Sequence, residues 1–378
     1  MCIRDRLISI IGIVGTALSI FLIMLVVMMQ QVKVAPFSPE SNRNRFLHVH
    51  YMSISHKDWG NGTSNGPMSV QTAREVYKSL KTPEAVTVYC CMTVSTPVSL
   101  PGAPAIGADV RETDDTFFHV FDFQFTDGKP YDEATFTAGR PVAVITESIS
   151  RALFGSIQSV GKEFLLSHAP YRVVGVVKDV STLADMAYGQ VWIPFTSTNL
   201  SNDTWSDNHM GMMSVTLLAH DREDFDEIRA EAKRRMNEYN SILADQGYTL
   251  IDRNRPYDQE TQSISFAANL EPDLKAARRE RVIIFIILLL VPAINLSSMT
   301  QSRLRQRVAE IGVRRAFGST RIEMVGQIVM ENLVITLLAG AIGLLISILF
   351  AYWGTDILFA QPYSCLLYTS DAADDLTR

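Results

Sequence analysis

The sequence predicts an α-helical transmembrane protein with a large α+β extracytoplasmic domain. Three apolar runs carry no charged residue over 7–29, 282–299 and 333–353, and each is long enough to cross a bilayer as a helix. The intervening segment 31–275 has ordinary globular composition. An arginine-rich stretch separates the second run from the third, which is typical of a short cytoplasmic loop.

Composition and motifs argue against several classes of function. The chain has 378 residues, of which 47% are hydrophobic, and its formal net charge is -6. A general nucleic-acid binder is not indicated, because such proteins are usually basic. The sequence has no Walker A, HExxH or CxxC pattern. We therefore expect no enzyme activity, no catalytic or metal-ligating residue, and no cofactor bound by this chain.

The apolar runs predict transmembrane helices at 7–30, 282–300 and 333–354. A signal peptide is the alternative for the first, but its apolar part is long and no small-residue cleavage site follows. Pro292 could kink the second helix. Asn295 could bond a neighbouring helix or lie near the membrane edge.

Both ends of the sequence look foreign. "MCIRD" and "CLLYTSDAADD" resemble the two strands of a transposon-end adapter used in shotgun sequencing. We expect residues 1–6 and 365–378 to be adapter-derived, with native sequence and a fourth span missing. Cys90 and Cys91 then remain in an apparent strand, where they would face opposite sides. One buried thiol beside one that faces elsewhere is expected, and a strained vicinal disulfide is the alternative.

The segment 31–275 repeats one order of elements. A strand, a helix and a strand are predicted at 45–55, 69–80 and 85–94, and again at 212–220, 224–243 and 248–253. Two such units predict a split β-α-β platform. The insertion 105–200 is strand-rich, with strands expected at 117–125, 141–149, 171–180 and 189–195. It therefore predicts an inserted mostly β subdomain. A short helix at 147–155 should stop at Gly155.

Three histidines lie close together in the first predicted strand region. His48 and His50 would share one strand face, with His56 nearby. A solvated face is the expected interpretation, and a metal site is the alternative.

The segment 301–332 predicts a cytoplasmic helix-turn-helix. Leu304, Val308 and Ile311 follow helical spacing. Gly318 can end that helix in the left-handed conformation, and Thr320 with Glu323 forms a capping-box pattern that opens the next helix. The basic stretch "KAARRER" at 275–281 lies on the expected outer side and weakens the charge asymmetry, although long domains cross the membrane largely regardless of charge.

The stretch "RVAEIGVRRAFGSTRIEMVGQIVMENLVITLLAGAIGLLI" resembles the permease module of FtsX/MacB-type ABC transporters, which read roughly E-I-G-[VI]-R-[RK]-A-[LF]-G-A-[ST]. The match runs from Glu310 to Thr320, with Ser319 where alanine is usual. The segment "TDDTFFHVFDFQF" through "YRVVGVVKDV" is similar to the extracytoplasmic core domain of the same family.

The resemblance implies a permease subunit in the cytoplasmic (inner) membrane, multi-pass, that partners a cytoplasmic ABC ATPase, which would bind the ATP. A second permease, a copy or a relative, and the lipid membrane would be its other partners, with no nucleic acid. ATP hydrolysis would move the outer domain for mechanotransmission-type export or extraction of a substrate. The residues implied in ATPase coupling are Glu310, Ile311, Gly312, Arg314, Arg315, Phe317, Gly318 and Arg321.

Three alternatives remain open. The chain could be an FtsX-like regulator of an envelope hydrolase. It could also be a membrane-anchored ligand-binding receptor or scaffold. The arginines could serve topology alone, since basic residues keep a loop inside.

Overall fold

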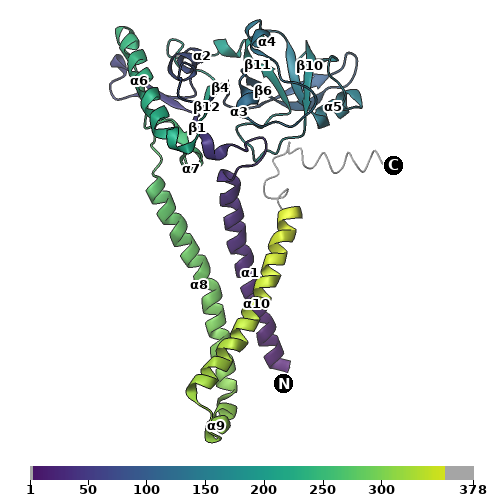
Figure 1. Ribbon diagram of the computed structural model, residues 1–378, viewed down its shortest axis with the longest axis vertical. Coiled ribbons are helices and arrows are strands. Elements are labelled where there is room, and N and C mark those ends of the chain that lie inside the picture. The colour runs from purple at the N-terminus through teal and green to yellow at the C-terminus, as the bar shows by residue number, and fades with distance from the viewer. Residues whose placement is uncertain (1–2, 354–378) are drawn as a thin grey trace. The chain divides into compact units, whose positions relative to one another are not determined.

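The computed structural model describes residues 3–353 (Figure 1). The described chain divides into two compact units: a helical unit that comprises the residues up to Val32 and those from Lys275 to Trp353, and an α/β unit between Lys33 and Leu274. The expected foreign segment 365–378 lies outside the described residues.

The helical unit contains long apolar helices and one short helix. Their bounds are α1 Ile3–Val34, α8 Leu274–Gln306, α9 Val308–Ala316 and α10 Arg321–Trp353. Within the described residues, α1, α8 and α10 are long and apolar enough to cross a membrane. The helices extend beyond the predicted spans, because α8 begins at Leu274, ahead of the basic stretch at 275–281, and α10 begins at Arg321. Pro292 lies inside α8, which continues on both sides of it.

Small residues bring these helices close together. A Cβ on Gly343 of α10 would lie 2.7 Å from the carbonyl oxygen of Ala17 on α1. Asn295 of α8 donates to the Gly12 carbonyl and to Thr16 Oγ1, both at 3.4 Å, so the prediction that it bonds a neighbouring helix is confirmed. Close backbone approach and interhelical polar contacts are the usual means of association for helices in lipid.

Replacing Gly343 with valine is expected to lower the stability of the helical unit by about 2 kcal/mol, because the new side chain overpacks the contact with α1. The measurement is the thermal unfolding midpoint in detergent. Gly326→Val is the matched control, since a Cβ at Gly326 of α10 meets nothing within 4 Å. An equal loss in both variants would show that the valine, and not the close approach, is responsible.

The platform of the α/β unit consists of four strands of the larger sheet and a separate smaller sheet. The four strands have the order β4-β12-β1-β14, and their bounds are β1 Phe46–Val49, β4 Ala85–Cys90, β12 Met213–Leu218 and β14 Tyr257–Asp258. The smaller sheet has the order β13-β2-β3, with bounds β2 Met52–His56, β3 Thr63–Gly66 and β13 Tyr248–Ile251. One apolar core includes side chains from both sheets and from α6.

The inserted region closes into a ring of paired strands. Each strand pairs with the next in the order β6-β11-β8-β10-β9-β5, and β5 pairs again with β6. The bounds are β5 Val94–Ser99, β6 Ile106–Thr113, β8 Val142–Thr146, β9 Glu163–Leu166, β10 Ala169–Val177 and β11 Val191–Pro194. A core cluster of its own, including Val173 and Ile145, comes from these strands and α5. The ring joins the platform where β6 pairs with β4.

Helices complete the α/β unit, with α6 on the platform side and α5 on the side of the ring (Figure 1). Their bounds are α2 Val70–Ala73, α3 Phe117–Val120, α4 Glu133–Thr137, α5 Glu147–Phe154, α6 Phe225–Leu243 and α7 Gln259–Gln262. A π-helical turn at Arg74–Lys78 follows α2. One further strand, β7 Phe125–Gly128, pairs with β10. The predicted helices at 69–80, 147–155 and 224–243 are confirmed. Gly155 ends α5 with φ +68°.

Two predicted strands differ from the structure. The strand predicted at 45–55 is two strands, because β1 pairs with β12 in the larger sheet whereas β2 pairs with β13 in the smaller one. The strand predicted at 117–125 is wrong: Phe117 and Val120 belong to α3. Phe117, Val120 and Phe121 are all buried, and their i, i+3, i+4 spacing is that of a helix.

The cysteines behave as predicted. Cys90 is buried, Cys91 is half-buried, and neither forms a disulfide. The strand predicted to continue to residue 94 ends at Cys90, and a new strand, β5, begins at Val94.

Candidate functional site

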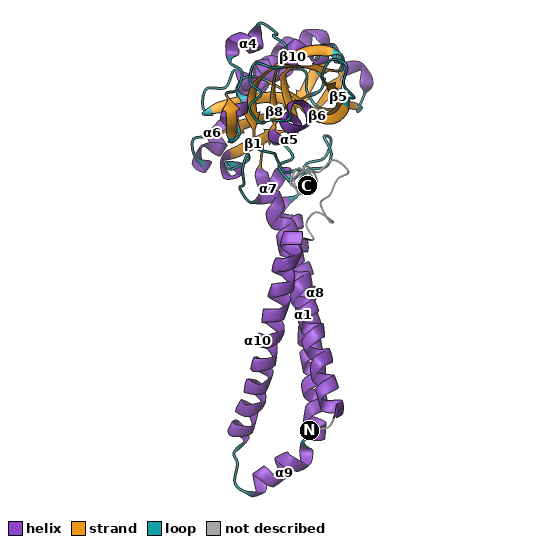
Figure 2. Ribbon diagram, turned by 90° about the vertical axis from the view of Figure 1, so that its right-hand side faces the viewer, coloured by secondary structure: helices purple, strands orange, loops and turns teal. Residues whose placement is uncertain are grey.

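The segment between the second and third long helices folds as a hairpin of α9 and the start of α10 (Figure 2). After α9, the Ser319 amide donates to the Arg314 carbonyl and the Gly318 amide to the Arg315 carbonyl, both at 3.1 Å. Gly318 has φ +93°. This is a Schellman motif, which glycine favours because it lacks a Cβ.

The next helix opens with the predicted capping box, which is confirmed. Thr320 Oγ1 accepts from the Glu323 amide at 3.4 Å, and Glu323 accepts from the Thr320 amide at 2.9 Å. Both ends of the turn are therefore held by hydrogen bonds, and the hairpin has a defined geometry.

The inner face of the hairpin, where α9 meets α10, is held by polar bonds around half-buried apolar side chains. Arg307 bonds Glu331 at 2.8 Å, and Arg314 bonds Gln327 at 2.7 Å and Glu310 at 2.6 Å. A cavity of about 40 Å³ between them is lined by Leu304, Ile311, Met324 and Ile328, together with the polar residues just named.

The outer face of the hairpin consists of side chains that α10 does not cover. Phe317 is 89% exposed and Ile322 is 85% exposed. Arg315 is exposed, and its guanidinium makes no hydrogen bond or ion pair within the part of the chain that the structure describes. A Cβ on Gly312 would meet nothing within 4 Å, so packing inside this chain does not require glycine there.

The eight residues implied in coupling therefore fall into three groups. Glu310, Ile311 and Arg314 hold the hairpin together. Gly318 makes the turn. The other four, Gly312, Arg315, Phe317 and Arg321, are exposed on the outer face. Gln327 and Glu331 also belong to the inner face, although no local pattern in the sequence indicates this.

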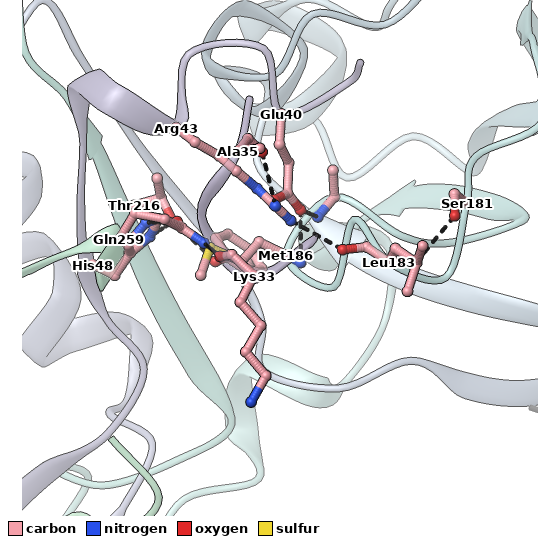
Figure 3. Close-up of polar contacts among 12 residues, drawn as sticks. Lys33, Ala35, Glu40, Arg43, His48, Ser181, Leu183, Met186, Thr216 and Gln259 are labelled. Carbon is pink, nitrogen blue, oxygen red and sulfur yellow. Dashed lines mark hydrogen bonds and ion pairs between the residues drawn. The ribbon is translucent and has the colours of Figure 1, made fainter. Parts of the chain in front are cut away.

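A second polar site lies where the chain leaves α1 and enters the α/β unit (Figure 3). Glu40 and Arg43 form a buried ion pair, with Arg43 Nε 2.7 Å from Glu40 Oε2 and side chains 0% and 3% exposed. Glu40 also accepts from the amides of Met186 and Ala187, at 2.9 and 3.0 Å. Arg43 donates further to the carbonyls of Ala35 and Leu183, at 3.1 and 2.9 Å.

A chain of hydrogen bonds links the same segment to the platform strands. Gln259 donates to the carbonyl of Lys33, in the last turn of α1, at 2.8 Å. Its amide oxygen lies 2.9 Å from His48 Nε2, and His48 Nδ1 lies 3.1 Å from Thr216 Oγ1 (Figure 3). Thr216 is also bonded to the Tyr89 hydroxyl at 2.9 Å. The last turn of α1 is thus bonded through α7 to strands β1, β12 and β4. We call this set of contacts, with the Glu40–Arg43 pair, the junction.

Comparison with known proteins identifies the family. Residues 7–235 match the family described as MacB-like periplasmic core domain, and residues 282–370 match the FtsX-like permease C-terminal family. The chain belongs to the MacB-like family. It is a membrane protein of the MacB/FtsX permease type, and its α/β unit is the extracytoplasmic domain. The predicted fold class is confirmed.

Relatives are similar over part of their length. The uncharacterized ABC transporter permease YknZ of Bacillus subtilis is 22% identical over 244 residues, which are 63% of this chain and 55% of YknZ. The macrolide export ATP-binding/permease protein MacB of Burkholderia cenocepacia is 24% identical over 64% of this chain and 33% of its own length. The chain thus spans about half of the length of YknZ and about a third of the length of the Burkholderia MacB. The periplasmic region of MacB from Actinobacillus actinomycetemcomitans is 19% identical, covers 54% of this chain and 88% of its own, and has a TM-score of 0.37.

In this MacB-like domain His48 is buried and His50 and His56 are half-buried, so the prediction of a solvated face is wrong. His48 is 0% exposed and both its ring nitrogens are hydrogen-bonded. His50 Nε2 is buried without a hydrogen-bond partner among the described residues. Burial lowers the pKa of both, that of His50 to about 4. His48 is part of the junction and His50 lies two residues further along the chain, and both rings are neutral at pH 7.

Lowering the pH from 7 to 5 is expected to remove stability that the neutral His50 ring contributes to the α/β unit. Unfolded histidine has a pKa near 6.5, so the unfolded chain takes up this proton first and the contribution falls between about pH 6.5 and 4. His50 alone contributes a loss of about 2 kcal/mol at pH 5. Glu112, whose pKa burial raises to about 7, acts in the opposite direction, so the loss is measured as the difference between the wild type and a His50 variant.

Thermal unfolding followed by circular dichroism measures the stability at both pH values. His50→Gln should remove the loss that His50 causes, whereas the exposed His220→Gln should retain it; an identical pH dependence in all three proteins would contradict the assignment.

Proposed function

We propose that this chain is the membrane subunit of an ABC transporter and is itself non-catalytic. A separate cytoplasmic ATPase would dock on the outer face of the hairpin, and ATP hydrolysis there would move the extracytoplasmic domain to export or extract a substrate. The chain would work in the cytoplasmic membrane with a second permease, either a copy or a relative. The Burkholderia relative is a macrolide export ATP-binding/permease protein, and its combination of ATP binding with permease function supports a partnership with an ATPase.

The observation that carries this proposal is the division of the hairpin into an inner and an outer face. The inner face uses its arginines and acids to fix the angle between α9 and α10. Within the described residues, the outer face leaves Phe317, Ile322 and Arg315 exposed and not covered by other parts of the chain. Exposed aromatic and arginine side chains on a rigid support are the residue types that dominate protein interfaces. A rigid docking element also transmits displacement, which a flexible loop would absorb.

The junction holds the start of the extracytoplasmic domain to its own platform. Lys33 is bonded to Gln259, and the segment that follows is fixed by the buried Glu40–Arg43 pair. Both contacts lie within the α/β unit.

The test is co-purification of an ATPase with the chain from detergent-solubilised membranes of its host. We expect ATPase activity in the wild-type eluate and its loss with Arg315→Glu. Arg234→Glu on α6 is the matched control, because it makes the same charge change on an exposed helix of the outer domain. Absence of ATPase activity from all eluates of well-folded protein would sink the transporter proposal and favour a receptor or scaffold.

A further inference from the structure

A shallow, open cleft of about 630 Å³ lies on the α/β unit, beside the smaller sheet. It is formed by the turn before β3, by β3 and β13, and by the loop that precedes β12, and its lining residues are Trp59, Gly62, Thr63, Ser64, Trp205, Ser206, Asp207 and Tyr248. None of these residues belongs to the hairpin or to the junction, so the mechanism proposed above does not use the cleft.

Aromatic rings dominate its surface. Trp59 is 40% exposed and Trp205 is 37% exposed, although tryptophan is usually well covered in folded proteins. The ring of Tyr248 packs edge-on against Trp59, with 5.8 Å between centroids and 77° between planes. Partly exposed aromatic side chains that gather in a concave site are typical of ligand-binding surfaces.

The rings are held in place before any ligand arrives. Trp205 Nε1 donates to Ser64 Oγ at 3.1 Å, and its ring lies against Gly66, where a Cβ would come within 3.0 Å. The backbone of Trp205 exchanges two hydrogen bonds with Met210, of 3.0 and 3.1 Å. A side chain fixed in this way loses little conformational entropy on binding, which favours affinity.

The charge of the cleft is negative. Asp207 is the lining residue that carries a formal charge at pH 7, and neither lysine nor arginine belongs to the described lining. Burial raises the pKa of the Tyr248 hydroxyl, with Asp207 adding to the effect, so that group is neutral. Asp207 lies in a turn where Ser206, Asp207 and Asn208 have φ of 52°, 50° and 69°. Such a conformation costs non-glycine residues about 1 kcal/mol each and is commonly retained at ligand sites.

We propose that this cleft binds an organic cation with an apolar body. The cationic group would lie against the indole faces of Trp59 and Trp205 and near the carboxylate of Asp207. Indole faces attract cations through the ring quadrupole. The carboxylate also attracts cations, and it repels anions. The volume accommodates a ligand larger than a single ammonium group. The proposal does not depend on ATPase coupling.

A neutral sugar is the competing ligand, since sugars also stack on tryptophan and bond hydroxyl groups such as those of Thr63 and Ser64. The two differ in their dependence on charge. A sugar would lose little when Asp207 becomes asparagine, because the amide keeps a hydrogen-bonding oxygen. A cation would lose the carboxylate's Coulombic attraction.

The experiment is isothermal titration of the full chain in detergent with benzyltrimethylammonium, benzenesulfonate and maltotriose as separate probes. We expect the cation to bind and the anion not to. Asp207→Asn should weaken cation binding by roughly fivefold and Trp59→Ala by roughly tenfold or more, in line with cation–π energies at partly desolvated sites. Asp58→Asn is the matched control, because this 75% exposed carboxylate is near Trp59 in sequence but does not line the cleft.

Three results would overturn the proposal: no heat from the cation at millimolar concentration, equal binding of cation and anion, or unchanged cation affinity in Asp207→Asn. Binding of maltotriose without the cation would assign the cleft to sugars instead. Trp59→Phe keeps an aromatic face and should retain most of the affinity, so it separates loss of the ring from loss of folding. Circular dichroism of each variant confirms the fold.

Discussion

Phe317→Ser is expected to reduce the ATPase that co-purifies with this chain by about 30-fold, which corresponds to roughly 2 kcal/mol for an aromatic interface anchor. The side chain is 89% exposed, so its removal costs the folded chain little. If a partner covers it, the same change removes a large buried apolar contact and leaves a polar group in its place. The measurement is ATPase activity per mole of permease in the eluate, across a range of ATPase concentrations.

Phe266→Ser provides the matched control for that variant. Phe266 is 82% exposed, but it lies in the α/β unit and not on the hairpin. The substitution makes the same chemical change, so any general effect of losing an exposed phenylalanine should appear in both variants. Equal ATPase recovery with Phe317→Ser and wild type would remove Phe317 from the docking surface, and equal loss in both variants would point to a folding or insertion defect.

The turn of the hairpin could be predicted from sequence because its signals are local. The glycine at 318 and the pair Thr320 and Glu323 act within one or two helical turns. The single helix predicted from the spacing of Leu304, Val308 and Ile311 is wrong, because α8 ends at Gln306, α9 begins at Val308, and the Val308 side chain is 65% exposed. What could not be predicted is which arginine faces which way. Arg307 bonds Glu331 across the turn, although the two residues are 24 positions apart in sequence. Arg314 bonds Gln327 of α10 whereas Arg315 is exposed, and this difference arises only from the packing of α9 on α10.

In the α/β unit, too, elements with local signals could be predicted from sequence, whereas pairings between distant strands could not. Single elements with strong periodicity, such as α6 and β12, were predicted correctly. The closed ring was not, because it depends on the pairing of β6 with β11, strands about 80 residues apart, in addition to pairing with β5. The change of sheet after Val49 also arises from the partners of β1 and β2, which no local pattern specifies.

The junction gave no usable signal in the sequence. A glutamate and an arginine three residues apart, as at Glu40 and Arg43, are common on solvated surfaces. Their burial follows from the amides of Met186 and Ala187, which are distant in the chain. His48 was assigned to a solvated face for a related reason, since its partners Thr216 and Gln259 are 168 and 211 residues away.

Arg43→Met is expected to destabilise the α/β unit by about 3–5 kcal/mol, because it leaves the carboxylate of Glu40 buried without its counter-charge. For a domain of this size the thermal midpoint should fall by about 10 °C. Arg172→Met is the matched control. Its pair with Glu163 is 62% and 59% exposed, so less than about 1 kcal/mol should be lost.

The pH dependence and a second substitution show whether the buried charge is responsible. Burial already raises the pKa of Glu40, and loss of Arg43 should raise it further. The folded variant then takes up a proton that the unfolded chain does not, so the defect caused by Arg43→Met should shrink as the pH falls from 7 toward 5. Glu40→Gln in the same background should recover about 2 kcal/mol at pH 7, because the amide oxygen can still accept from the two backbone amides. A defect that is independent of pH and is not relieved by Glu40→Gln would mean that Arg43 acts through its contacts with Ala35 and Leu183, and the ion pair would then not be what fixes this segment to the domain.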